Sequence, residues 1–142
     1  MKEKRKILSV FTGWVTNSKP RAVNIQSVFS VGDLPYKIDF TVGATIMFSR
    51  GAEAFNLRFD IYDPFGNELN NETHEVDPDL EINYSSLDGL GCYLVSLTPS
   101  SHAAKTEGVY KVTATLTDED EEVIEKMDTF FILSKKWIGG EY

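Results

Sequence analysis

The side chains that could carry out covalent chemistry are few in this sequence. It contains one cysteine and two histidines among 142 residues. Cys92 opens the apolar run Cys92-Tyr93-Leu94-Val95, whereas His74 and His102 both lie in polar segments. A cysteine nucleophile needs a neighbouring base or another group that lowers the pKa of its thiol. We therefore predict that Cys92 is a buried or half-buried structural residue.

Carboxylates are plentiful, and two acidic clusters are candidate calcium-binding sites. The first contains Asp118, Asp120 and Glu122, and the second contains Asp77, Asp79 and Asp88. Calcium requires six to eight oxygen ligands gathered by a tight loop, and neither cluster has the spacing of an EF-hand. The first cluster also lacks the glycine that lets such a loop wrap around an ion. A solvated charged turn is the favoured interpretation, and calcium binding is the alternative.

Motifs that identify enzymes are missing from the sequence. It has no GxxxxGK[ST] or GxGxxG phosphate loop, no HExxH or CxxC metal or redox motif, and no GxSxG nucleophile elbow. Pairs of carboxylates could hydrolyse glycosidic bonds, but no spacing selects two of the 22 acidic residues. We predict no catalytic residue, no bound cofactor and no enzymatic activity.

The net charge of the chain disfavours some classes of binding partner. The formal net charge is −8, and the basic residues gather only in the N-terminal arm, residues 1–6. This balance disfavours nucleic acid and anionic membranes, because both are recognised by clustered lysine and arginine. No apolar run approaches the ~18 residues of a membrane span, and no cleavage site follows residues 7–11. We expect a cytoplasmic protein.

The hydrophobic pattern that must position any site has a period of two residues. Apolar and polar side chains alternate through Tyr36–Phe48, Phe55–Tyr62 and Tyr110–Leu116, and less regularly from Val123 to Leu133. Phe130–Leu133 is apolar on both faces, which is typical of a central or doubly covered strand. Weaker strands are predicted over residues 7–15, 23–31 and 93–98. About seven strands and no helix predict one all-β domain over residues 1–142, an antiparallel β-sandwich of immunoglobulin-like type, with a small barrel as the alternative.

Turn residues divide these strands. Asp63-Pro64-Phe65-Gly66 and Asp118–Glu121 each predict a turn after a strand, and Gly51 lies in a connection short enough for a hairpin. Gly43 predicts a bulge within Tyr36–Phe48. Residues 68–91 are predicted to be a polar insertion loop, in which Val76, Leu80, Ile82 and Tyr84 could form a short edge strand. Residues 135–142 form a tail with two candidate partner-binding aromatics, Trp137 and Tyr142.

Three segments of the chain resemble a known group of proteins. They are Asn24-Ile25-Gln26-Ser27-Val28-Phe29 (N-I-x-x-V-F), Asp63-Pro64-Phe65-Gly66 (D-P-x-G) and Gly108-Val109-Tyr110 (G-x-Y). Their order is similar to that in a family of uncharacterised bacterial immunoglobulin-like β-sandwich domains. The resemblance implies a sandwich fold and a bacterial or phage origin, and it transfers no catalytic residue. In such folds, Tyr110 either donates a tyrosine-corner hydrogen bond to nearby backbone or is a simple core aromatic.

Three classes of function are compatible with these observations. The favoured prediction is a non-catalytic binding module that contacts a protein partner through its loops or a sheet edge. A structural or assembly subunit that associates with itself is the second. The third is a calcium- or carbohydrate-binding domain, in which Trp14, Tyr62 or Trp137 could stack on a sugar.

Overall fold

The protein is all-β in the computed structural model, which describes residues 5–16, 22–49, 51–78, 90–99 and 103–135. Eleven strands and no helix are found in these ranges. No described segment is therefore a long apolar helix that could cross a membrane. The strands are β1 (Arg5–Val15), β2 (Val23–Ile25), β3 (Val28–Ser30), β4 (Tyr36–Lys37), β5 (Thr41–Ser49), β6 (Phe55–Tyr62), β7 (Glu68–Val76), β8 (Leu90–Leu97), β9 (Ala103–Ala104), β10 (Gly108–Thr117) and β11 (Val123–Ser134).

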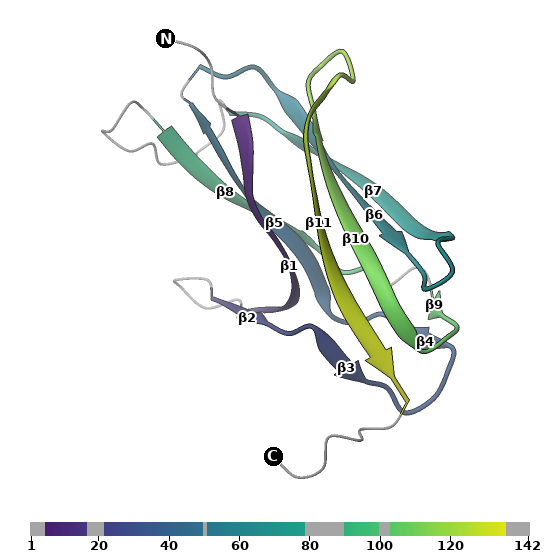
Figure 1. Cartoon of the computed structure of the whole chain (residues 1–142). Helices are drawn as coiled ribbons and strands as arrows, with labels where there is room; N and C mark the ends of the chain where they lie inside the picture. The colour runs from purple at the N-terminus through teal and green to yellow at the C-terminus, as the bar shows by residue number, and fades with distance from the viewer. Residues whose placement is uncertain (1–4, 17–21, 50, 79–89, 100–102, 136–142) are drawn as a thin grey trace.

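Two sheets make up most of the molecule (Figure 1). The first has four strands in the order β2-β1-β5-β8, and the second has five in the order β3-β11-β10-β6-β7. A third sheet contains only β4 and β9. The predicted count of about seven strands was too low. Four of the eleven strands have only two or three residues, too few to produce a recognisable alternation.

Side chains from both large sheets meet in one hydrophobic core. In β6, Phe55, Leu57, Phe59 and Ile61 point inward and are almost completely buried. The ring of Phe48 on β5 lies 5.4 Å from that of Phe55, centroid to centroid, and so links the two sheets. The alternation of β6 and β10 therefore leaves their other residues on the outer face of the five-stranded sheet.

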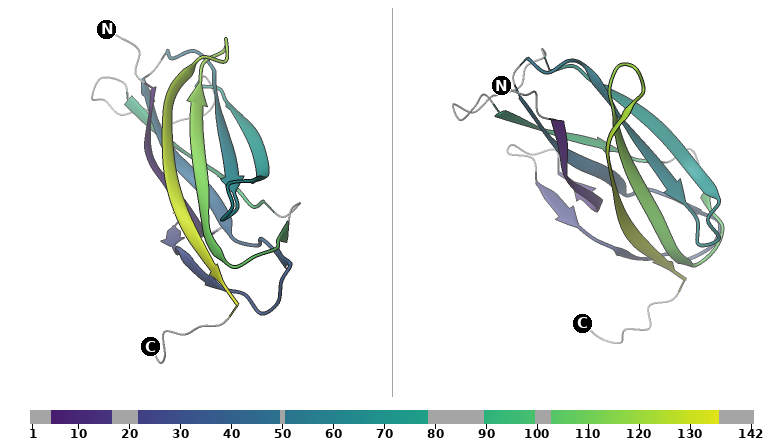
Figure 2. Two further views of the ribbon diagram at one scale, coloured as in Figure 1. Left: turned by 45° about the vertical axis from the view of Figure 1, so that its right-hand side comes forward. Right: turned by 45° about the horizontal axis from the view of Figure 1, so that its top comes forward.

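The two sheets approach each other along one side, where β1 and β11 lie next to one another (Figure 2). There the backbone N–H of Ile7 on β1 donates a hydrogen bond of 3.0 Å to Oε1 of Glu125 on β11. A side-chain carboxylate thus satisfies a backbone donor between strands that do not pair in a ladder.

Both predicted turns are confirmed, and both join neighbouring antiparallel strands of the five-stranded sheet. Oδ1 of Asp63 accepts hydrogen bonds from the backbone N–H groups of Phe65 and Asn67 between β6 and β7. Gly66 adopts a φ of 86°, which glycine tolerates without strain. Between β10 and β11, Oδ1 of Asp118 accepts the equivalent bonds from Asp120 and Glu122. In each turn, one aspartate carboxylate organises the backbone.

Two local predictions about β5 were wrong. The segment 36–48 is interrupted at residues 38–40, whereas Gly43 lies within the continuous strand β5 and forms no bulge. A Cβ atom at Gly43 would come within 2.4 Å of the Phe11 ring, so close packing explains this glycine. The connection through Gly51 is not a hairpin, because β5 pairs with β1 and β8 while β6 pairs with β7 and β10. The chain instead crosses from one sheet to the other.

The predicted insertion loop over residues 68–91 was also wrong in its described parts. Residues Glu68–Val76 form β7, an edge strand paired with β6, and β8 begins at Leu90. Charged side chains are typical of edge strands, and together with two asparagines they gave this strand the composition of a loop. Residues 79–89, with the predicted strand residues Leu80, Ile82 and Tyr84, lie outside the described residues.

The remaining expectations had mixed outcomes. The hydroxyl of Tyr110 donates a hydrogen bond of 2.7 Å to the carbonyl oxygen of Thr106, while its ring is buried in the core, so both predicted roles are combined. The strands are not all antiparallel, because β3 runs parallel to β11.

Cys92 is exposed, so its predicted burial was wrong. On β8 its side chain points away from the core.

Candidate functional site

The first acidic cluster, Asp118, Asp120 and Glu122, lies at the tip of the β10–β11 hairpin. Of the second cluster, Asp79 and Asp88 lie outside the described residues. Oδ1 of Asp118 is engaged by two backbone N–H groups and acts as a turn-forming acceptor. Among the described residues, no group of three or more histidine, cysteine or acidic side chains is arranged to hold a metal ion. Calcium binding by Asp118, Asp120 and Glu122 stays the alternative to a solvated charged turn. Trp137 and Tyr142, the candidate partner-binding residues, lie outside the described residues.

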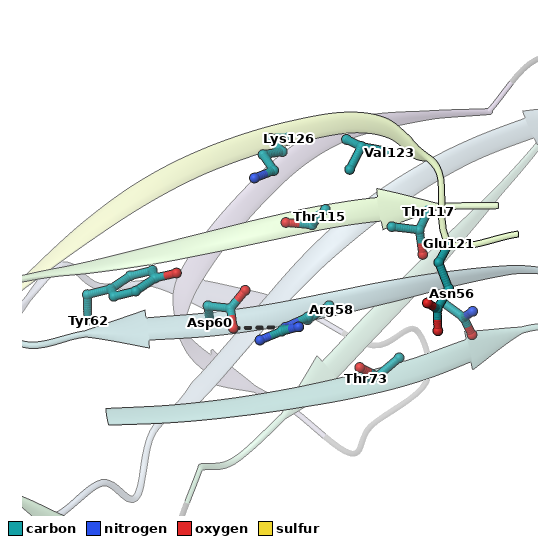
Figure 3. Close-up of a pocket in the computed structure, with 10 residues that line it drawn as sticks. All are labelled: Asn56, Arg58, Asp60, Tyr62, Thr73, Thr115, Thr117, Glu121, Val123 and Lys126. Atoms are coloured by element: carbon teal, nitrogen blue, oxygen red, sulfur yellow. Dashed lines mark hydrogen bonds and ion pairs between the residues drawn. The ribbon is translucent and has the colours of Figure 1, made fainter. Parts of the chain in front are cut away.

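A polar groove of about 470 Å³ opens on the outer face of the five-stranded sheet (Figure 3). Strands β6, β7, β10 and β11 and the hairpin tip contribute its walls. We call this the polar groove, and its lining residues are Asn56, Arg58, Asp60, Tyr62, Thr73, Thr115, Thr117, Glu121, Val123 and Lys126. Its size is within the range of pockets that bind small ligands.

Strand register places the side chains of the polar groove in rows. Lys126, Thr115, Arg58 and Thr73 lie opposite one another across β11, β10, β6 and β7. Because side chains alternate between the two faces of a strand, all four belong to the outer face. Segments that are far apart in the sequence thus build a continuous polar surface.

An ion-pair cluster occupies the centre of this surface. Nε of Arg58 donates to Oδ1 of Asp60 at 2.9 Å, and its Nη2 lies 3.4 Å from Oε1 of Glu68. Asp60 is only 6% exposed although it lies on the outer face. Burial, together with the neighbouring carboxyl of Glu68, raises the pKa of Asp60. The hydrogen bond shared with Asp60 lowers the pKa of Glu68, so these two carboxyl groups titrate as a pair.

Neighbouring polar side chains are similarly satisfied within the protein. Thr113 is 9% exposed, and its hydroxyl donates a hydrogen bond of 2.8 Å to Oδ1 of Asp128 on β11. Tyr62 lies at one end of the polar groove, with Nζ of Lys111 5.1 Å from the centre of its ring. The cation is held over an aromatic face, which is a favourable contact.

A row of exposed apolar side chains lies beside the polar groove on the same face. Ile132 on β11 is opposite Val28 on β3 and Val109 on β10. Phe130 precedes Ile132 by two residues and is opposite Lys111. Their exposed fractions are 37% for Val28, 40% for Ile132 and 53% for both Val109 and Phe130. We call these four residues the apolar row. Strand β11 lies between β3 and β10, so Phe130–Leu133 belongs to a central strand, one of the two predicted alternatives, but its outer face is not covered.

Most of the side chains that line the polar groove carry hydroxyl, amide or charged groups. They include no cysteine, histidine or serine, and the polar groups at the centre are engaged with one another. The arrangement can therefore supply hydrogen bonds, an aromatic ring and local charge to a bound molecule. Sequence reasoning did not single out the groove, although the alternation of β6 and β10 correctly assigned Arg58, Asp60 and Thr115 to the polar side of their strands.

Comparisons with known proteins do not assign the chain to a family. No protein-family model matches it, and no curated protein matches it. One solved structure with some likeness is described as "putative beta-galactosidase from bacteroides fragilis", with 18% sequence identity and a TM-score of 0.41. The likeness covers 70% of this chain, which spans only 15% of the length of that protein. This similarity is too low to support an inference about fold or activity.

Proposed function

We propose that the protein is a non-catalytic interaction module, an immunoglobulin-like β-sandwich that binds a protein partner through the apolar row. One observation supports this proposal above all. Val28, Ile132 and Val109 lie opposite one another on neighbouring strands of an exposed sheet face, with Phe130 beside them. Soluble proteins seldom leave apolar side chains together in water without a use for them. Burying such side chains is the main source of affinity in protein interfaces.

The charge next to the apolar row specifies the chemistry of the partner. Lys111 follows Val109 by two residues on the outer face and lies opposite Phe130. A partner that buries the row therefore approaches an ammonium group at its border. The complementary surface is apolar with an adjacent carboxylate, since opposite charges at the rim of an interface steer association and fix its orientation. We propose a partner segment of this acidic and apolar kind.

Selection of peptides on the immobilised protein tests this function. We expect a library of random peptides to yield binders that combine apolar residues with an aspartate or glutamate. Ile132→Thr should weaken their binding at least about ten-fold, because an apolar contact is replaced by a hydroxyl. Peptides selected on the Lys111→Glu variant should no longer contain the aspartate or glutamate, because the new carboxylate would repel it.

The matched control is Ile25→Thr, because Ile25 on β2 is 73% exposed and lies in the other sheet. It should leave peptide binding unchanged. Selected peptides that bind I132T and I25T equally would contradict the proposal. A dimer in sedimentation experiments that dissociates in I132T would assign the row to a second copy of this chain instead, and would equally overturn it.

A further inference from the structure

The polar groove differs from the apolar row in the charge that it offers. Two basic residues, Arg58 and Lys126, and two acidic residues, Asp60 and Glu121, line it. Arg58 is already held by Asp60 and by Glu68 beyond the lining. A phosphate or another strong anion would be opposed by these carboxylates, and a cation would be opposed by the guanidinium and ammonium groups. The charge balance therefore favours a ligand that is itself neutral.

The hydrogen-bonding groups of the polar groove both donate and accept. Thr73, Thr115 and Thr117 contribute hydroxyl groups, and Asn56 contributes a side-chain amide. Each of these groups offers donor and acceptor sites at nearly the same point. A ligand with the same dual character on adjacent atoms matches them best. Neighbouring hydroxyl groups on a sugar ring have this character.

The shape and position of the groove agree with such a ligand. The groove runs along the outer face of the sheet, from Asn56 and Glu121 near the hairpin tip toward Tyr62 (Figure 3). It is open to solvent and its lining residues are mostly polar, unlike the enclosed apolar pockets that bind lipids or flat hydrophobic molecules. Tyr62 supplies an aromatic ring at one end, and a sugar whose C–H groups pack there shares this ring with the ammonium group of Lys111.

We propose that the polar groove binds a neutral carbohydrate, an oligosaccharide whose hydroxyl groups pair with Asn56, Thr115 and Thr117. Arg58 and Asp60 lie between these groups, and the ion pair between them orients both side chains. None of the four residues of the apolar row lines this site, although the two regions meet at Lys111, whose Nζ lies 5.1 Å from the centre of the Tyr62 ring. Sugar binding does not depend on whether the row binds a protein.

An array of neutral and anionic oligosaccharides, followed by NMR titration of the hits, tests this proposal. We expect neutral sugars to bind the intact protein and to shift the amide resonances of β6 and β10. Thr117→Val and Asn56→Leu should each weaken binding about five- to ten-fold, because each removes hydrogen-bonding capacity from the groove. Thr41→Val is the matched control, since Thr41 is a half-buried threonine of the four-stranded sheet.

The outcomes separate this proposal from the preceding one. Sugar binding that persists in I132T but weakens in T117V supports a carbohydrate site in the polar groove. Binding of anionic sugars alone, equal binding by T117V and T41V, or no bound sugar on the array would each overturn it. Because peptide selection uses a different probe and a different variant, failure of either proposal is recognised without reference to the other.

Discussion

The apolar row and the polar groove share one face of the five-stranded sheet but depart from ordinary surface chemistry in opposite ways. In the apolar row, Ile132 and Phe130 remain in contact with water. In the polar groove and its border, Asp60 and Thr113 are withdrawn from water although they are polar. The neighbours of Asp60 and Thr113 satisfy them, whereas nothing in the described part of the chain covers the apolar row.

This difference indicates that the polar groove contributes mainly to stability and the apolar row mainly to binding. The groove side chains form ion pairs and hydrogen bonds with one another, so removing one partner leaves another unsatisfied. The side chains of the apolar row lose little when they are replaced, because they were not fully buried. We therefore expect substitutions in the groove region to lower stability, and those in the row to affect binding.

The largest expected effect on stability is that of Arg58→Met. At neutral pH this change leaves the buried Asp60 carboxylate without its ion-pair partner, and we expect a loss of roughly 1–3 kcal/mol in the free energy of unfolding. Urea denaturation measures it. Arg58 lowers the pKa of Asp60, so the loss should shrink in acid, where Asp60 is protonated and has no charge to compensate. A loss that is independent of pH would show that packing, and not charge, explains the effect.

A smaller effect is expected from Thr113→Val. This substitution keeps the shape of the side chain but removes the hydrogen bond to Asp128, and it should cost about 1 kcal/mol. Thr115→Val is the control, because Thr115 lies two residues away on the same face and is just as buried, at 8%. No hydrogen bond of the Thr115 hydroxyl to another side chain is found among the described residues, so T115V should be nearly neutral in denaturation. Equal losses in both variants would argue against the assigned hydrogen bond.

The acid titration of the paired carboxyl groups provides a more subtle test. Carbon-detected NMR should show that Asp60 titrates above its ordinary pKa of 3.8 and Glu68 below its ordinary 4.5. A raised pKa means that Asp60 favours the folded state while protonated, and this contribution is lost as the pH rises through the folded pKa. The lowered pKa of Glu68 has the opposite effect, which is lost as the pH falls. In R58M the pKa of Asp60 should rise further, and an Asp60 that titrates below 3.8 would contradict the described cluster.

The sequence predicted the local features of this fold better than its long-range ones. Alternation correctly gave β6 and β10, and the Asp-Pro-x-Gly pattern gave the turn at Asp63. These features depend on neighbouring residues. The strand order could not be predicted, because pairing of β6 with β10 joins residues about fifty positions apart, as in Asp60 and Thr113. The groove exists only because of that pairing.

The apolar row was hidden from sequence reasoning for a related reason. Four consecutive apolar residues at 130–133 are typical of a strand that is covered on both faces. Whether the second face is covered depends on what packs there, and no strand in the described ranges packs over Phe130 and Ile132. The pattern therefore identified a strand with two apolar faces, and the structure showed that one of them is left exposed.

The most direct test of the account compares Ile132→Thr with Ile25→Thr in two measurements on each variant, the unfolding free energy and the affinity for selected peptides. We predict that both variants change stability by no more than about 0.5 kcal/mol, as surface substitutions usually do. Only I132T should lose peptide affinity, because Ile132 is at the centre of the apolar row. Unchanged affinity in I132T, or equal losses in both variants, would contradict the claim that this exposed face binds a partner.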